Sequence, residues 1–163
     1  MTTKFKILSK KNLYDGFFKM NEVKIKYRKY DGNWSNEVTR ELFGGAQVSA
    51  VLPYDPIKNE IILLQQFRAG TISKKYDNYL FEIVAGIIDK GETPEQAAIR
   101  ECLEETGCHV KKLTPIQSYF PAPGSSESFY HLFLGEIKTF EGTRIMGIES
   151  ENEDIKVESF DVD

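Results

Sequence analysis

The sequence predicts a single domain of mixed α/β (α+β) class, in which many strands are combined with few helices. Three observations support this. The 163 residues suffice for one domain with a sizeable core, and no linker or internal repeat divides them. Most apolar runs are short or alternate with polar residues, as strands do. One segment alone carries both a helix-start and a helix-stop signal.

Strands are expected from the N-terminal region onward. Apolar and charged residues alternate over 23–27, residues 31–33 read as a turn, and residues 34–43 can return as the partner strand. Buried strands are expected at 46–55 and 59–67, on either side of a turn that contains proline. Further apolar runs predict strands at 79–86, 117–120, 128–137 and 155–162.

One helix is expected over residues 94–106. Thr93 is a candidate N-cap, Pro94 suits the first helical position, and Glu95 favours the positive end of the helix. Gly107 follows the last helical residue, where a left-handed cap is needed.

This helix has two different sides. At about 100° per residue, one side holds four residues that are expected to pack on the sheet: Ile99, Cys102, Leu103 and Thr106. The other side holds three glutamates that are expected to face outward into a cleft: Glu101, Glu104 and Glu105. No lysine stands four residues on to relieve their repulsion. An acidic face can simply be solvated, but carboxylates that converge also suit Mg²⁺ or Mn²⁺.

Composition limits the classes of function. Hydrophobic residues make up 40% and charged residues 28% of the chain, and the net charge is −4. This charge argues against general nucleic-acid binding, but it allows a phosphorylated small molecule. No apolar run suits a signal peptide or a membrane span. Cys102 and Cys108 are expected to be reduced, buried thiols, and the protein is expected in the cytoplasm.

The residues around the helix follow a fixed spacing. Five residues separate Gly86 from Glu92, and seven more precede Arg100 and Glu101. Glu104, Glu105 and Gly107 complete the pattern, with cysteine at its two apolar positions. This pattern resembles the signature of the Nudix hydrolases, and every fixed letter is present. The resemblance implies a Nudix fold, a mixed sheet sandwiched between helices, and substrates that contain a nucleoside diphosphate.

The same resemblance assigns roles to the motif. Glu101, Glu104 and Glu105 would bind two or three Mg²⁺ or Mn²⁺ ions, and the backbone carbonyl of Ala85 would be a further ligand. Arg100 would orient a glutamate, Glu92, and so brace the junction between loop and helix. Gly86, which opens the motif, would lie in the substrate site.

The resemblance extends over most of the chain, from Leu13 to Val157. The segments LYDGFF, NEVTRELF, QQFRAG, EIVAGIIDKGE, PAPGSSE and ENEDIKV are similar to the ADP-ribose pyrophosphatases, and Pro123 stands fifteen residues after Cys108, as in that subgroup. This implies metal-dependent hydrolysis of ADP-ribose to AMP and ribose 5-phosphate. Two alternatives stay open. One is hydrolysis of another nucleoside diphosphate sugar, such as GDP-mannose or ADP-glucose. The other is a non-catalytic nucleotide-sugar sensor, which the intact motif disfavours.

A diphosphate and an adenine each need partners. Arg68, at the end of a predicted strand, is the best cation for the diphosphate, with a surface salt bridge as the alternative. Phe17, by resemblance, and Trp34 are candidates for stacking on adenine, with Arg40 nearby. The alternative for Phe17 is a place in the core. By resemblance alone, Glu127 would lie near the terminal ribose.

An acidic run covers residues 149–157 and could be a solvated loop. It resembles the loop that supplies the catalytic base in the ADP-ribose pyrophosphatases. On that match, Glu151 is the general base, which takes a proton from the attacking water, and Glu153 is a further metal ligand. A carboxylate close to several anions has its pKa raised toward the working range.

The resemblance also implies how the chain is organised. Residues 1–45 would form an N-terminal strand region that crosses to a second subunit of a homodimer, and residues 46–163 would form the Nudix domain. Relatives of this type normally carry a further helix after the last strand, whereas this sequence ends at Asp163.

Overall fold

The computed structural model describes residues 4–73, 75 and 77–162, except for the side chain of Glu151. Contacts divide the chain into two compact units. Unit 1 comprises Met1–Ala46 and Phe120–Phe129, and unit 2 comprises Gln47–Tyr119 and Tyr130–Asp163.

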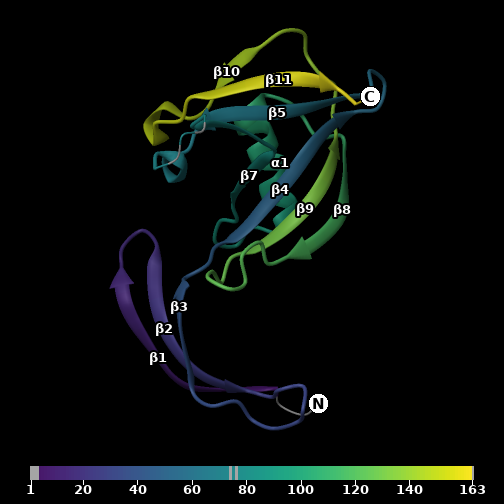
Figure 1. Ribbon diagram of the computed structural model, residues 1–163. Helices are drawn as coiled ribbons and strands as arrows, with labels where there is room; N and C mark the ends of the chain where they lie inside the picture. The colour runs from purple at the N-terminus through teal and green to yellow at the C-terminus, as the bar shows by residue number, and fades with distance from the viewer. Residues whose placement is uncertain (1–3, 74, 76, 163) are drawn as a thin grey trace. The chain divides into compact units, whose positions relative to one another are not determined.

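Unit 1 is built on a three-stranded antiparallel sheet in the order β1-β2-β3 (Figure 1). Its strands are β1 (Phe5–Asp15), β2 (Lys19–Tyr27) and β3 (Val38–Phe43). β2 contains the predicted strand 23–27, and β3 is the predicted return, although it begins four residues later than expected. β1 was not predicted, because all of its residues are exposed and its apolar side chains do not alternate regularly with polar ones.

A glycine makes room for the second segment of unit 1. The backbone N–H of Phe43 donates to the carbonyl of Ser125, and that of Glu127 donates to the carbonyl of Phe43. A Cβ atom added at Gly45 would overlap the backbone of Glu127 and Ser128. Only glycine therefore allows the two segments to approach this closely.

Unit 2 is built on an eight-stranded sheet, whose main strand order is β10-β11-β5-β4-β9-β8 (Figure 1). In addition, β6 pairs with β5, and β7 pairs with β4. The single strand expected at 79–86 is divided into these two short strands, β6 and β7, which pair with different neighbours. The strand expected at 117–120 is only the end of β8, whose register shifts after Pro115. The strand bounds are β4 (Gln47–Asp55), β5 (Glu60–Phe67), β6 (Tyr79–Glu82), β7 (Val84–Ile87), β8 (Lys112–Tyr119), β9 (Phe129–Glu136), β10 (Arg144–Met146) and β11 (Ile155–Asp161).

The helix α1 (Pro94–Thr106) has the predicted bounds. The hydroxyl of Thr93 accepts from the backbone N–H of Gln96, whose side chain in turn accepts from the backbone N–H of Thr93. Gly107 adopts the left-handed conformation with φ 70° and ends the helix. With the large sheet, α1 confirms the predicted mixed α/β class, and it is the one α-helix of the described residues.

The side of α1 that packs on β4 and β7 differs from the prediction. Ile99 and Leu103 are 44% and 41% exposed, so the prediction that they face the sheet was wrong. Small side chains let the helix come close to the strands, and Glu105 shares this side instead of facing outward. The buried residues of α1 are Ala97, Ala98, Cys102, Glu105 and Thr106. Cys102 and Cys108 are free and buried, as expected.

The buried core of unit 2 lies among α1, β4, β5, β7, β9 and β11. Cys102 and Cys108 belong to this core. Its larger members are aliphatic residues and two phenylalanines: Val51, Ile62, Leu64, Val84, Phe133, Ile137, Phe140, Ile155 and Val157. No helix in the described ranges is long and apolar enough to cross a membrane.

Asp55 should be a strong contributor to stability. Its buried carboxylate accepts from the backbone N–H of Ile57 and from both the N–H and the hydroxyl of Thr139. The hydrogen bond from the Thr139 N–H, with the others, lowers the pKa of Asp55 to about 2. Asp55→Ala should lower the free energy of unfolding by about 2–4 kcal/mol, because buried donors lose their partner.

Urea unfolding at pH 7 measures this loss. Because the pKa of Asp55 is depressed on folding, its contribution is present above pH 4 and disappears as the pH falls through about 2. The exposed Asp31, which pairs with Lys29 at 2.8 Å, is the control, and Asp31→Ala should change stability little. Equal losses in the two variants at pH 7 would contradict the prediction.

Candidate active site

Arg100 organises the acidic side of α1. Its Nε and Nη2 each donate to Glu92 at 2.9 Å, and its Nη1 donates to Glu101 at 2.7 Å and Glu104 at 3.0 Å. The paired carboxylates, Glu92 first, raise the pKa of Arg100, and Arg100 in turn lowers the pKa of Glu92. The absence of lysine suggested that nothing relieves the repulsion between the helix glutamates. The structure shows that Arg100 relieves it. The arginine takes that role, and it contacts Glu92 as the motif implied.

Glu105 is the least neutralised carboxylate of the motif. Its side chain is buried, and its Oε2 accepts one hydrogen bond, from the backbone N–H of Ala85 at 3.3 Å. Burial first, and then repulsion from Glu101, raises the pKa of Glu105 to about 8. Glu153 adds to this repulsion, whereas Arg68 opposes it. A buried carboxylate with anionic neighbours is poised to take up a proton or a cation.

Glu101 combines a contact with the Arg100 guanidinium and partial burial. Its carboxylate contacts Arg100, but burial outweighs this contact and raises its pKa. The same carboxylate lies against Gly86 of β7. It fills the space that a Cβ atom would occupy if residue 86 were not glycine. Gly86 therefore keeps open the space that the Glu101 carboxylate occupies.

Gly86→Ala should displace the Glu101 carboxylate with little effect on stability, because the atoms that clash are the far end of a flexible side chain. We expect turnover to fall at least tenfold while the melting temperature changes by no more than a few degrees. Steady-state kinetics and thermal unfolding measure the two effects. Gly124→Ala is the control, because no atom lies within 4 Å of its added Cβ. Normal turnover in Gly86→Ala would contradict the role given to Glu101.

The glutamates do not form a preassembled metal cage. No three His, Cys, Asp or Glu side chains in the described part of the chain are gathered as a metal ion requires. Arg100 donates to Glu101 and Glu104, and the Ala85 N–H donates to Glu105. The role of these three glutamates as metal ligands stays a prediction. The donors still fit a divalent cation chemically. They are hard oxygens, and Glu105 has excess negative charge around it.

Arg68 lies close to this cluster and is held by a residue that was not predicted. Its Nε and Nη2 donate to the two carboxylate oxygens of Glu82 at 2.7 Å each, in a bidentate pair that raises the pKa of Arg68. Arg68 and Glu153 also line one pocket of about 370 Å³. The sequence carried a signal for Glu82, because it is the one charged residue in the apolar run YLFEIVAG.

The acidic run forms a turn before β11. Its first part is a short 3₁₀ helix, η2 (Glu149–Glu151), which ends at Asn152 with a left-handed φ of 56°. The carboxylate of Glu153 accepts from the backbone N–H of Ile148 at 3.1 Å. Glu153 thus also closes the turn, a role that the sequence did not suggest. The side chain of Glu151, the predicted base, lies outside the described residues.

The remaining predicted site residues belong to unit 1. Phe17 is 87% exposed, so the alternative that it lies in the core is wrong. Lys6 and Arg28 lie over the ring of Trp34, 4.7 and 4.3 Å from its centre. Arg40 donates to the carbonyl of Thr39.

Glu127 has a cationic partner. It pairs with Lys10 at 3.2 Å, a contact that no motif predicted because it joins β1 to a segment more than a hundred residues away.

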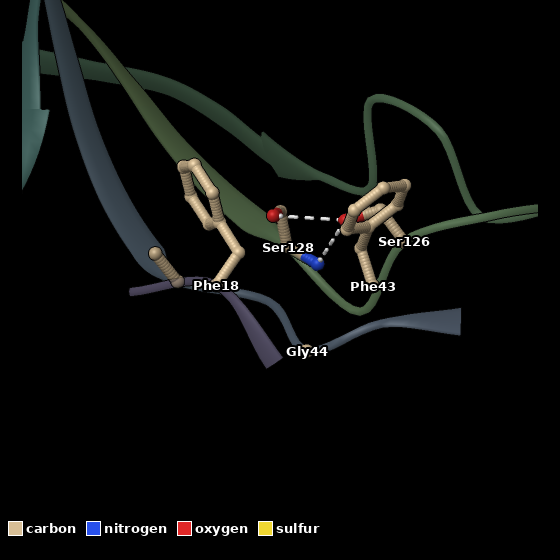
Figure 2. A pocket seen from close by; sticks show the side chains of 6 residues that line it. Phe18, Phe43, Gly44, Ser126 and Ser128 are labelled. Carbon is tan, nitrogen blue, oxygen red and sulfur yellow. Dashed lines mark hydrogen bonds between the residues drawn. The ribbon is translucent and has the colours of Figure 1, made fainter. Parts of the chain in front are cut away.

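Unit 1 also contains an apolar pocket of about 310 Å³ (Figure 2). The rings of Phe18 and Phe43 stand on its left and right in this view, and the hydroxyl of Ser126 donates to that of Ser128 at 2.9 Å. Gly44 and Ala46 complete the lining. The pocket combines flat apolar surface with a few polar atoms, as sites for small organic ligands do.

Comparison with known proteins gives consistent matches. The family model for the NUDIX domain matches residues 45–163. The ADP-ribose pyrophosphatase of Haemophilus influenzae is 40% identical over 154 residues, which cover 93% of this chain and 71% of that protein. The ADP-ribose pyrophosphatase of Escherichia coli K12 is 35% identical over 151 residues, 93% of this chain and 72% of that protein.

Two further matches are more distant. A GDP-mannose pyrophosphatase of Salmonella arizonae is 28% identical over 158 residues, 96% of this chain and 81% of that protein. A crystal structure of an ADP compounds hydrolase superposes with a TM-score of 0.71 at 21% identity, covering 98% of this chain and 79% of that one. This last likeness confirms the expected fold.

Proposed function

This chain belongs to the Nudix hydrolase family, and from that premise we propose that it hydrolyses the pyrophosphate bond of ADP-ribose to AMP and ribose 5-phosphate. The observation that carries the proposal is the cluster around Glu105 at the complete Nudix motif, where the charges of Glu101 and Glu153 repel a buried carboxylate and that of Arg68 attracts it. A cluster of this kind can bind both a cation and a phosphate.

Mg²⁺ is the proposed cofactor, and Mn²⁺ can replace it. Glu101, Glu104, Glu105, Glu153 and the carbonyl of Ala85 are the residues that would hold two or three ions. When bound, the ions would neutralise the pyrophosphate and stabilise the charge that develops on its oxygens. Arg100 would then keep Glu92 and the helix glutamates in position.

The protein groups carry out the remaining steps. Arg68, aligned by Glu82, would bind a phosphate oxygen with its free guanidinium edge. Glu151 would take a proton from water as the water oxygen attacks phosphorus. The bond from phosphorus to the bridging oxygen then breaks, and the second phosphate leaves with that oxygen.

Recognition of the adenine and the terminal ribose is proposed for unit 1. The exposed ring of Phe17 supports a stacking role, and the apolar pocket next to Phe18 supports binding of a flat ring. Arg40 is the proposed polar contact and Glu127 the proposed contact to ribose. Because cations lie over its ring, Trp34 is the weaker stacking candidate.

A hydrolysis screen tests the substrate. ADP-ribose, ADP-glucose, GDP-mannose and NADH are supplied with Mg²⁺ at equal concentrations, and kcat/KM is compared. We expect ADP-ribose to have the highest value. GDP-mannose as the best substrate would favour the second function, which the similarity to a GDP-mannose pyrophosphatase motivates. No hydrolysis of any of them would favour a sensor.

A homodimer is also proposed, because β1 exposes many apolar side chains, among them Phe5 at 57%, Ile7 at 60% and Tyr14 at 63%. Apolar surface of this kind marks an interface. Ile7→Glu should shift the protein toward monomer in sedimentation velocity. Ile57→Glu is the matched control, since Ile57 is 88% exposed in a turn of unit 2. A dimer equally stable in both variants would contradict an interface on β1.

The proposed compartment is the cytoplasm. Two free cysteines, both buried, suit a reducing environment.

A further inference from the structure

A second pocket in unit 2 carries an unusual charge. Its volume is about 450 Å³, and it lies at the C-terminal end of α1, where Gly107 ends the helix. Four of its lining residues are basic: His109, Lys111, Lys138 and Arg144. None of the described residues that line it is acidic, although the chain as a whole carries a net charge of −4. These four residues define the basic pocket.

The two lysines of the basic pocket are not neutralised by a carboxylate. Within the described ranges, neither Lys111 nor Lys138 has an acidic partner within 4.0 Å, and both are exposed. Neighbouring lysines differ. Lys112 pairs with Glu136 at 3.0 Å and Lys156 with Glu158 at 2.8 Å. Uncompensated like charges that share one cavity repel each other, and an anion would relieve that repulsion.

Arg144 is already fixed in the wall of the basic pocket. Its guanidinium stacks on the buried ring of Phe140, 3.8 Å from the ring centre, and its Nη1 donates to the carbonyl of Thr106 at 3.2 Å. This bond uses one of five guanidinium donors, so others stay available to a ligand. An arginine that is held in place before binding loses little entropy when it binds an anion.

We propose that the basic pocket binds a small phosphate monoester at a site separate from the glutamate cluster. A phosphate monoester carries nearly two negative charges and three acceptor oxygens, which match two lysines and a fixed arginine. The volume suits a small metabolite. The net negative charge of the chain disfavours a polyanion such as nucleic acid.

The site would act on both parts of the catalytic cluster. Arg144 contacts the last turn of α1 through Thr106, the residue that follows Glu105, and it begins β10, which leads into the turn that carries Glu153. A ligand that binds the remaining donors of Arg144 would therefore adjoin both elements.

Binding of glycerol 3-phosphate to the ¹⁵N-labelled full chain, with EDTA present and ionic strength held constant, tests the proposal. We expect amide shifts concentrated in residues 107–111 and 138–144. In Lys111→Gln/Lys138→Gln the dissociation constant should rise about tenfold. The control Lys112→Gln/Lys156→Gln removes the same charge from paired lysines and should bind as the wild type does.

Three results would overturn the proposal. One is equal weakening in both double variants, which would show a general charge effect. Another is a set of shifts confined to residues 84–105, which would place the ligand at the glutamate cluster. The third is equal affinity for sulfate or citrate, which would show no preference for a phosphate monoester. Turnover of ADP-ribose without added ligand should be unchanged in both double variants, so failure of the proposed function would be seen separately.

Discussion

Replacing Glu105 with glutamine should lower kcat for ADP-ribose by about 10³-fold, the largest loss expected from any change on α1. Glutamine keeps the shape of the side chain, and its oxygen can still accept from the Ala85 N–H. It cannot supply the negative charge that a divalent cation needs at this buried position. The effect should persist at saturating Mg²⁺, because the missing ligand is a contact of the transition state.

The same change should make the metal-free protein more stable at alkaline pH. The pKa of Glu105 rises to about 8 on folding, from an ordinary value of 4.5, so the folded state binds a proton that the unfolded state has released. Its contribution is therefore full below pH 4.5 and is lost as the pH rises through 8. In EDTA, the melting temperature of the wild type should fall as the pH rises from 5 to 8.5. The melting temperature of Glu105→Gln should fall less.

Glu95→Gln is the control for both measurements, since Glu95 is exposed in the first turn of the same helix. It should leave turnover and the pH dependence of stability unchanged. Near wild-type activity of Glu105→Gln at saturating Mg²⁺ would exclude Glu105 as a metal ligand. If the slope of melting temperature against pH is the same in Glu105→Gln as in the wild type, Glu105 is not the group whose proton stabilises the folded state.

The bounds of α1 could be predicted from the sequence because they depend on local chemistry. Thr93, Pro94 and Gly107 each act within one turn of the residue that they cap, and the structure has the same helix over 94–106. The orientation of the helix could not be predicted in the same way. A helical wheel ranks sides by hydrophobicity, whereas α1 packs through its small residues Ala97 and Ala98 and leaves Ile99 exposed.

The candidate site shows the same division. The motif spacing predicted Glu101, Glu105 and Arg100 as site residues, because this spacing depends on one short segment of the sequence. Contacts between side chains on different strands could not be predicted from a short segment of this kind. Arg68 follows β5 and Glu82 ends β6, and their contact depends on the register between these two strands. Lys10 and Glu127 likewise meet only after folding. Partners of this kind need the strand order, which the sequence pattern did not supply.

Glu151→Gln should lower the rate of the chemical step by roughly 10²–10⁴-fold while binding of substrate and Mg²⁺ stays near that of the wild type. Glutamine keeps the size and one acceptor of glutamate but cannot take a proton from water. Single-turnover rates measure the step, and titration with a non-hydrolysable ADP-ribose analogue measures binding. Glu149→Gln, an exposed change in the same 3₁₀ helix, is the control and should be neutral.

Glu153→Gln should behave differently, and the contrast tests the two roles assigned to this turn. The amide oxygen of glutamine can still accept from the N–H of Ile148, so the turn should keep its shape. What is lost is a negative charge next to Glu101 and Glu105. The Mg²⁺ concentration needed for half-maximal activity should therefore rise, and excess Mg²⁺ should restore part of the rate. If Glu151→Gln instead responds to Mg²⁺ and Glu153→Gln does not, the base is Glu153 or lies on α1. If neither change affects the rate, the acidic run is a solvated turn and the base lies among Glu104, Glu127 and Glu92.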